Sequence, residues 1–198
     1  MGNLASVAKG LERVGARVTM TADPAAVRRA GAVVLPGVGA FRDASDRLEG
    51  SGLADALLAR IQEGVPFLGV CLGLQLLFDG SEEDDAGGLG LIPGMVRALR
   101  DTPRLPHIGW NDIAMARPDP LFSGIEPGTT FYFVHSFAPV ADDPGDVIAT
   151  SEYGHPFVAA ARRGRVAGLQ FHPERSGAAG LRILANFVTE AGSAAHAA

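Results

Sequence analysis

The chain has 198 residues, 47% hydrophobic and 20% charged, enough for one globular α/β domain with a full core. Its net charge of −5 argues against a dedicated nucleic-acid binder, which usually carries a basic face; one cysteine excludes an internal disulfide and fits a reducing compartment. No apolar run is long enough to span a bilayer, and the N-terminus has no signal-peptide pattern, so we expect a single cytoplasmic domain over residues 1–198.

The first half of the chain alternates strand-like and helix-like segments. The predicted helices cover 3–14, 24–30, 43–63 (broken near 50–52) and the residues after Cys71 to about 79, and the predicted strands cover 16–20, 31–35 and 67–70. Such alternation predicts a doubly wound, mostly parallel sheet with helices on both faces. Folds of this kind usually begin with a strand, whereas this chain begins with a helix.

The second half is rich in short β-type runs. An acidic, glycine-rich stretch at 80–90 comes first and is predicted to be a solvated surface loop. The predicted strands cover 94–99, 107–115, 129–137, 146–153, 156–162 and 165–171. Turn residues separate them, which predicts an antiparallel extension of the parallel sheet. A final helix is expected over 177–191, with a frayed tail after it.

The most informative stretch surrounds Cys71. Residues 67–70 are apolar without alternation, as in a strand covered on both faces, and apolar residues at helical spacing follow the cysteine. Gly69 and Gly73 remove side chains that would clash at a sharp strand-to-helix corner. A lone cysteine is more often a small buried hydrophobe, but this context is that of a nucleophile elbow with sulfur as the nucleophile. The helix N-terminus favours the thiolate.

A cysteine nucleophile needs a base and a group that orients the base. His172 follows the apolar run 166–171, and Glu174 comes two residues later. The carboxyl ends of parallel strands line the crevice of an open α/β sheet, so we expect Cys71 and His172 to meet there, with Glu174 turned back toward the imidazole. A metal site at His172 and Glu174 is disfavoured, because no other ligands stand at metal spacing, and we expect neither metal nor cofactor.

The other histidines are weaker candidates. His196 lies in the tail, and His155 stands beside a proline in a turn. His107 and His135 end or interrupt apolar runs and fit hydrogen-bonded core residues.

The oxyanion of an acyl-transfer reaction needs backbone donors. One candidate is the N–H group of Leu72, directly after the nucleophile. The second candidate is the segment Gly37, Val38 and Gly39, whose glycines let a peptide flip at little steric cost. An ordinary turn after a strand is the alternative for this segment.

Two motifs in this order resemble those of the class I, triad-type glutamine amidotransferases. They are residues 69–73, around the cysteine, and residues 170–174, about 100 residues later. Residues 36–41, 107–111 and 132–137 also look like the glutaminase subunits of imidazole glycerol phosphate synthase, an enzyme of histidine biosynthesis. The resemblance covers essentially the whole chain.

The resemblance implies hydrolysis of L-glutamine to glutamate and ammonia through a cysteinyl thioester. Cys71 would be the nucleophile, His172 the proton carrier and Glu174 the orienting carboxylate. Gln75 and the backbone of three consecutive residues would position the glutamine substrate; these residues are His135, Ser136 and Phe137.

The resemblance also implies a partner. Ammonia would pass into a (β/α)₈-barrel cyclase subunit that makes imidazole glycerol phosphate and aminoimidazole carboxamide ribotide, in a heterodimer. Asn3 and Trp110 would face that barrel, although burial in the core is the alternative for Trp110. Glutaminase activity would be weak alone, and reorientation of the 36–39 strand would complete the oxyanion site.

The chain departs from the family pattern at three places. Residues 1–7 match the segment that normally follows the family's first strand, so we expect the natural chain to begin upstream of Met1 with one further strand. Phe137 stands where tyrosine is common, and Arg175 where lysine is common.

Three alternatives stay open. Amidotransferase subunits of vitamin B6, anthranilate or GMP synthesis share the elbow and the His-x-Glu pair but usually differ at 36–41. A non-catalytic partner-binding module would need no intact triad. A stand-alone cysteine hydrolase would be fully active without any partner.

Overall fold

The computed structural model describes the backbone of residues 2–195 and the side chains of residues 4–193. Its main sheet has the strand order β1 (Val33–Gly37), β2 (Phe67–Cys71), β12 (Val166–Leu169), β11 (His155–Arg163), β10 (Val147–Tyr153) and β7 (Ala114–Met115). A second sheet has the order β4 (Ala86–Gly87), β3 (Gly80–Ser81), β5 (Gly94–Ala98) and β9 (Phe137–Ala141), and β6 (His107–Asp112) pairs with β8 (Thr130–His135).

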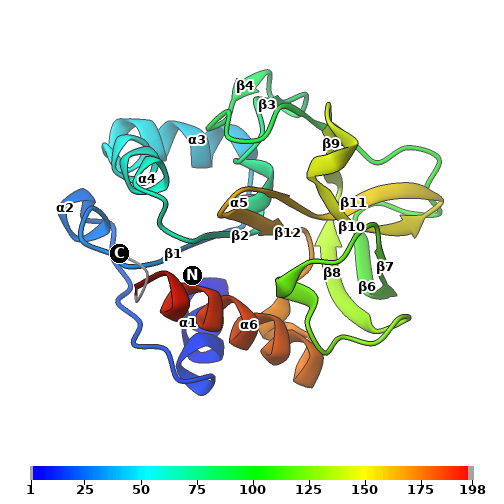
Figure 1. Cartoon of the computed structure of the whole chain (residues 1–198). Helices are drawn as coiled ribbons and strands as arrows, with labels where there is room; N and C mark the ends of the chain where they lie inside the picture. Colours follow the sequence, from blue (N-terminus) through cyan, green and yellow to red (C-terminus); the bar gives the residue numbers. More distant parts are fainter. Residues whose placement is uncertain (1, 196–198) are drawn as a thin grey trace.

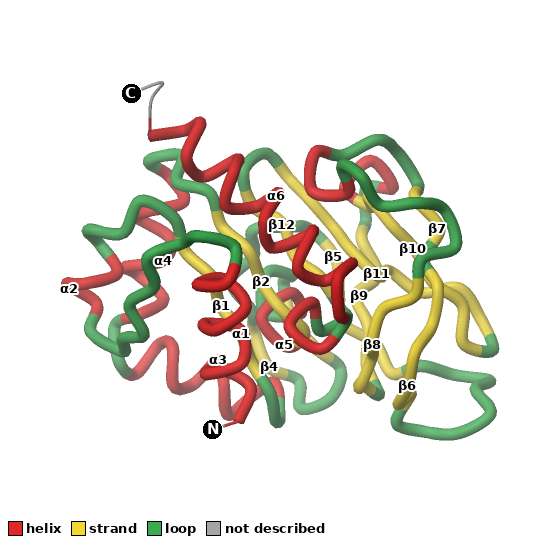
Figure 2. Tube along the Cα trace, turned by 90° about the horizontal axis from the view of Figure 1, so that it is seen from below, coloured by secondary structure: helices red, strands yellow, loops and turns green. Residues whose placement is uncertain are grey.

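The helices are α1 (Gly2–Arg13), α2 (Pro24–Val27), α3 (Phe41–Gly50), α4 (Leu53–Gln62), α5 (Leu72–Gln75) and α6 (Gly177–Ala195), with short 3₁₀ turns η1 (Pro120–Phe122), η2 (Pro144–Asp146) and η3 (Pro173–Arg175). Figure 1 shows α1 and α6 side by side on one face of the main sheet and α3 and α4 on the other. Seen from below in Figure 2, α1 and α6 lie in front of the strands of the main sheet.

The predicted fold class is confirmed. Strands β1, β2 and β12 run parallel, and β11, β10 and β7 continue the sheet antiparallel. The extension therefore contributes as many strands to the main sheet as the parallel part. None of the helices within residues 2–195 is long and apolar enough to cross a membrane.

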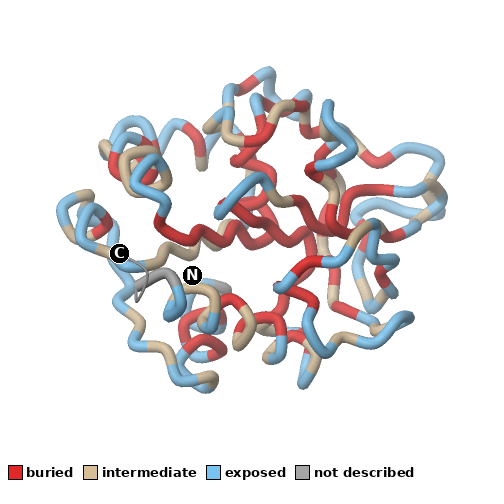
Figure 3. Tube along the Cα trace, in the orientation of Figure 1, coloured by how far each residue is buried: buried red, intermediate tan, exposed pale blue. Residues whose placement is uncertain are grey.

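Strand β2 is buried along its whole length, as its unbroken apolar run predicts. Leu68 and Val70 join the core cluster that contains side chains of α1 and α6, whereas Phe67 joins the cluster under α3, α4 and α5. Each fully buried side chain of this size contributes about 1.5–3 kcal/mol. In Figure 3 the buried residues form a continuous band through β2 and β12, which makes β2 the centre of the core.

Helix α5 lies directly on the backbone of the sheet. A Cβ atom at Gly73 would come within 1.8 Å of the Leu35 carbonyl oxygen, and one at Gly69 within 2.4 Å of the Gly73 oxygen. On β12, a Cβ atom at Gly168 would lie 2.5 Å from the Leu74 side chain. The glycines therefore set the height of α5 above the sheet, and with it the place of the corner that follows β2.

Most predicted element boundaries hold within a few residues, and the break between α3 and α4 falls at the predicted glycines. The predicted strand 16–20 is wrong. Ala16 and Val18 do pack on the core as alternation requires, but within the described residues no strand pairs with this segment. A strand is defined by its hydrogen-bonded neighbour, and alternation alone does not supply one.

The helix after Cys71 ends at Gln75 rather than near residue 79. The carbonyl groups of residues 76–78 accept hydrogen bonds from the N–H groups of residues 89–91, so the chain pairs with a distant segment instead of continuing the helix. The acidic stretch at 80–90 is not only a loop, because it contains the short antiparallel pair β3–β4. Met1 and the tail residues 196–198 lie outside the described residues. The further strand that the family pattern predicts upstream of Met1 also lies outside them.

We predict that Gly73→Ala lowers the free energy of unfolding by about 3 kcal/mol or more, because the added methyl group overlaps a strand carbonyl that cannot move freely. Gly50→Ala is the matched control, since a Cβ atom there meets nothing within 4 Å, and its stability should be unchanged or slightly higher. Urea unfolding of the two variants measures the difference, and equal stabilities would contradict the proposed packing.

Candidate active site

Cys71 stands at the corner between β2 and α5. Its backbone has φ 58° and ψ −110°, a conformation that residues other than glycine rarely adopt and that costs about 1–3 kcal/mol. The side chain is 7% exposed, and its sulfur lies 3.9 Å from the Val134 carbonyl oxygen. The strained corner is the predicted nucleophile elbow, and it holds the sulfur at the carboxyl end of the central strand.

His172 and Glu174 form the predicted pair. His172 Nδ1 lies 3.0 Å from Glu174 Oε1, and both side chains are buried. The backbone of His172 is fixed as well, because its N–H donates to the Tyr132 carbonyl at 2.8 Å and its carbonyl accepts from Ser176 Oγ at 2.6 Å. The imidazole therefore has a single orientation, with Nδ1 on the carboxylate.

The charge state of His172 follows from its neighbours. Burial alone lowers the pKa of an imidazole, but hydrogen bonds and charge interactions with Cys71 and Glu174 outweigh burial and raise the pKa of His172 to about 9. At neutral pH this pKa favours the protonated ring, whose Nδ1 atom lies on the Glu174 carboxylate. It already holds the proton that a leaving amine needs.

The predicted oxyanion donors lie beside the nucleophile. Gly37 is the register partner of Cys71 across the β1–β2 pair, and the Leu72 N–H group starts α5. A Cβ atom at Gly37 would come within 2.9 Å of Leu72 Cβ, so only glycine allows the two segments to approach this closely. Val38 is 53% exposed and Gly39 has φ 107°, so the segment turns outward directly after the pairing ends.

Gln75 reaches across the site from α5. Its Nε2 atom donates to the Phe137 carbonyl at 2.9 Å and to Gln170 Oε1 at 3.1 Å. Phe137 is therefore close to Gln75 as expected, and the Ser136 carbonyl accepts from Leu99 N at 2.9 Å. At this bond the chain leaves β8, which pairs with β6, and begins β9, which pairs with β5. The predicted strand 129–137 is therefore divided into two strands.

Sequence reasoning missed Gln170 as a site residue. Its side chain is fully buried, and its Nε2 atom lies 3.8 Å from the Cys71 sulfur. A usable signal was present, because residues two apart in an extended segment point to the same side, and Gln170 stands two residues before His172. The ring of His135 is buried, as its interpretation as a hydrogen-bonded core residue predicts, and its Nδ1 atom lies 2.9 Å from the Phe137 carbonyl oxygen.

Trp110 lies on β6 and is 57% exposed, with its ring edge-on to Tyr132 at 6.2 Å. The core alternative for this residue is therefore wrong. The side chain of Asn3 lies outside the described residues.

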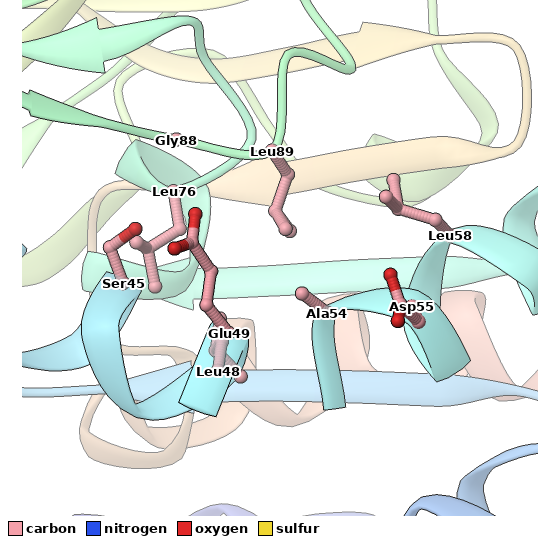
Figure 4. A pocket seen from close by; sticks show the side chains of 9 residues that line it. All are labelled: Ser45, Leu48, Glu49, Ala54, Asp55, Leu58, Leu76, Gly88 and Leu89. Carbon is pink, nitrogen blue, oxygen red and sulfur yellow. The ribbon is translucent and has the colours of Figure 1, made fainter. Parts of the chain in front are cut away.

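A hollow of about 300 Å³ lies between α3, α4 and residues 88–89 (Figure 4). It is lined by Ser45, Leu48, Glu49, Ala54, Asp55, Leu58, Leu76, Gly88 and Leu89. Neither Cys71 nor His172 belongs to this lining, and the Ser45 hydroxyl in it donates to the Gly87 carbonyl at 2.7 Å, so the hollow lies apart from the predicted triad.

Comparison with known proteins agrees with the geometry. The sequence profile of the family described as glutamine amidotransferase class-I matches residues 2–191. The chain belongs to the class I glutamine amidotransferases.

Curated relatives match this amidotransferase over nearly their whole length. Imidazole glycerol phosphate synthase subunit HisH of Syntrophotalea carbinolica is 49% identical over 195 residues, covering 94% of this chain and 95% of the relative. The subunit of the same name from Moorella thermoacetica is 48% identical over 200 residues, covering 99% and 95%.

Solved structures agree on the fold of this amidotransferase. A crystal structure of a glutamine amidotransferase has a TM-score of 0.73 at 22% identity and covers 96% of this chain and 95% of its own. A crystal structure described as that of a GMP synthase subunit from Thermoplasma acidophilum has a TM-score of 0.73 at 20% identity, covering 98% and 90%. At these identities the likeness supports the fold alone.

We predict that acid weakens the fold because His135 is buried as a neutral ring. Burial lowers the pKa of His135 to about 3, with smaller contributions from His107 and His172 and an opposing hydrogen bond to Phe137. In an unfolded chain the pKa is about 6.5. Between these values only the unfolded chain binds the proton, so the free energy of unfolding falls by about 1.4 kcal/mol for each pH unit below about 6.5.

Urea unfolding from about pH 7 to about pH 4 measures this slope. His135→Asn removes the titrating ring and should make the slope shallower by about one proton. Phe133→Leu is the control, because it removes a neighbouring ring at 5.7 Å and no titrating group, and it should lower stability equally at every pH. A slope in His135→Asn as steep as in the natural sequence would refute the assignment.

Proposed function

We propose that this chain is the glutaminase subunit of imidazole glycerol phosphate synthase, an enzyme of histidine biosynthesis, and that Cys71, His172 and Glu174 are its catalytic residues. One observation carries the proposal: the only cysteine stands on a strained strand-to-helix corner beside a buried histidine–carboxylate pair. Near-full-length similarity to curated HisH subunits supports the same assignment.

In the first half of the reaction, the Cys71 thiolate attacks the side-chain amide carbon of glutamine. A C–S bond forms and the carbonyl oxygen takes the negative charge. When the intermediate collapses, the C–N bond breaks and His172 gives its proton to the leaving nitrogen, which departs as ammonia. Glu174 holds Nδ1 of His172, so the opposite nitrogen carries the transferred proton.

In the second half, the neutral His172 takes a proton from water as the water attacks the thioester carbon. The C–S bond then breaks, glutamate leaves, and the thiolate–imidazolium pair is restored. The raised pKa of His172 favours that restored pair at neutral pH. One glutamine and one water thus give one glutamate and one ammonia.

The oxyanion of each tetrahedral intermediate is held by backbone N–H groups. The Leu72 N–H and a peptide N–H of Gly37, Val38 or Gly39 are the donors, each worth about 3 kcal/mol of barrier. The exposed, glycine-flanked turn after β1 lets this second donor swing toward the sulfur when the complex becomes active. Gln75 and the backbone of His135, Ser136 and Phe137 position glutamine.

The proposal extends to the partner and the compartment. Ammonia passes to a (β/α)₈-barrel cyclase subunit, which makes imidazole glycerol phosphate and aminoimidazole carboxamide ribotide in the cytoplasm. The partner surface lies on β6, where Trp110 is 57% and Ile108 is 59% exposed. Large exposed apolar side chains gathered on one strand are typical of a protein interface. The chain acts as a single glutamine amidotransferase domain over residues 1–198.

We predict that glutamate release by this chain rises when the barrel subunit is added together with its nucleotide ligand, and that Cys71→Ala lowers the stimulated rate by at least about 1000-fold. The readout is glutamate formed per enzyme, measured with and without partner. Full activity without partner would instead favour a stand-alone hydrolase. A Cys71→Ala rate equal to that of the natural sequence would favour a non-catalytic binding module.

We predict that Trp110→Ala weakens binding of the barrel subunit by about 30-fold, since an aromatic anchor buried in an interface is worth about 2 kcal/mol. Val140→Ala on β9 is the matched control, because Val140 is 51% exposed but lies on another sheet. Isothermal titration calorimetry measures both affinities, and equal affinities for the two variants would exclude Trp110 from the interface.

A further inference from the structure

Two buried histidines face each other behind the active site. His107 on β6 and His135 on β8 are register partners, and His107 Nδ1 lies 3.1 Å from His135 Nε2. Their side chains are part of an aromatic cluster, in which the His107 ring stacks on Tyr153 with 4.0 Å between ring centroids. Such a pair fits a packed core, but His135 also makes a hydrogen bond to a group outside the pair.

The hydrogen positions in this pair follow from one carbonyl group. His135 Nδ1 lies 2.9 Å from the Phe137 carbonyl oxygen, and a carbonyl can only accept, so Nδ1 carries the hydrogen. In a neutral ring Nε2 must then be the acceptor, and His107 Nδ1 must be its donor. Burial lowers the pKa of both rings and keeps them neutral. Only one pair of tautomers satisfies both contacts.

The same carbonyl continues the chain of hydrogen bonds toward the sulfur. Phe137 O accepts a second hydrogen bond from Gln75 Nε2, whose other hydrogen goes to Gln170 Oε1. These contacts fix which end of each amide is nitrogen, and they aim Gln170 Nε2 at the Cys71 sulfur, 3.8 Å away. A continuous series of contacts thus runs from a ring on β6 to the nucleophile.

The outer end of this series reaches the surface of the protein. His107 belongs to the lining of an open hollow of about 690 Å³ on the β6 and β10 side, together with Trp110 and Tyr153. The inner end donates an N–H group to sulfur, and such a donor stabilises a thiolate and holds it in place. Two histidines that only packed in the core would need neither a place at the surface hollow nor hydrogen bonds that lead to the sulfur.

We propose that His107 and His135 are positioning residues of the glutaminase reaction, which act through the Phe137 carbonyl and Gln75 to keep Gln170 donating to the Cys71 sulfur. The proposal rests on the glutaminase function given above. It assigns His107 a part in the reaction although His107 itself touches neither sulfur nor substrate. Removing the Nδ1–H donor of His107 leaves His135 Nε2 unpaired and frees the His135 ring and the two amides to turn.

Alkylation by iodoacetamide tests the proposal, because the chain has one cysteine and the reaction needs neither glutamine nor partner. His107→Phe keeps a ring against Tyr153 but removes the donor. We expect it to slow alkylation at neutral pH about 10-fold and to move the midpoint of the pH–rate profile upward. His107→Asn keeps a donor near Nδ1 but loses the ring. It should therefore lower stability while leaving the alkylation rate within about 2-fold of that of the natural sequence.

Three further variants separate positioning from packing. Gln170→Leu should reproduce the shifted profile, and the double variant with His107→Phe should add nothing, because both changes break one series of contacts. Phe157→Leu removes a ring that packs on His135 at 4.9 Å and touches none of these hydrogen bonds, so it should lower stability without a shift.

An unshifted profile in His107→Phe, or an equal shift in Phe157→Leu, would overturn the proposal. If His107→Phe does not fold, His107→Leu takes its place, because it also removes the donor, and an unshifted profile in that variant would overturn the proposal. Glutamate release by the natural sequence with its partner is measured in parallel. If the natural sequence releases glutamate but the His107→Phe profile is unshifted, only the positioning role is refuted. If the His107→Phe profile is shifted but the natural sequence releases no glutamate, the glutaminase assignment is refuted and the contacts to the sulfur remain supported.

Discussion

The active site depends on one steric constraint, the direct contact of the α5 backbone with the backbone of β1 and β2. Gly73 lies against the Leu35 carbonyl and Gly69 against the Gly73 carbonyl, with no side chain between them. The corner therefore cannot widen, and Cys71 stays at positive φ. Its strain of about 1–3 kcal/mol is offset locally by buried leucines at 72 and 74, whose burial is worth at least as much.

The electrostatics of the site follow from that geometry. The corner brings the sulfur into a buried region where His172 contacts Glu174. Charges interact more strongly in such a region than in water. A buried imidazolium would be unfavourable alone, but here it has an anionic partner at Nδ1 and sulfur as its other partner. Among the described residues, no carboxylate contributes to the pKa of His135, and burial keeps its ring neutral. One histidine of the site is thus protonated and the other neutral, because their neighbours differ.

The parts of this structure that the sequence predicts are those encoded locally. The elbow needs Gly69, Cys71 and Gly73 within five residues, and the His172–Glu174 pair needs three, so short motifs specify both. What could not be predicted depends on pairing between distant segments. The early end of α5 follows from bonds to residues 89–91, and the division of β8 from β9 follows from the bond between Leu99 and Ser136. The segment 16–20 has the alternation of a strand, but no strand pairs with it in the part of the chain that the structure describes.

The four residues from Val134 to Phe137 each make a different contact, three through a backbone carbonyl and one through a ring. The carbonyl of 134 faces the nucleophile, the ring of 135 contacts the next histidine, the carbonyl of 136 bonds to the end of β5, and the carbonyl of 137 accepts from α5 and from the 135 ring. A one-residue slip of an extended segment turns every group to the opposite side. Side-chain replacement at Val134, Ser136 or Phe137 leaves these carbonyl contacts in place, whereas an insertion or deletion here would break the contacts to three sheets and to the sulfur at once.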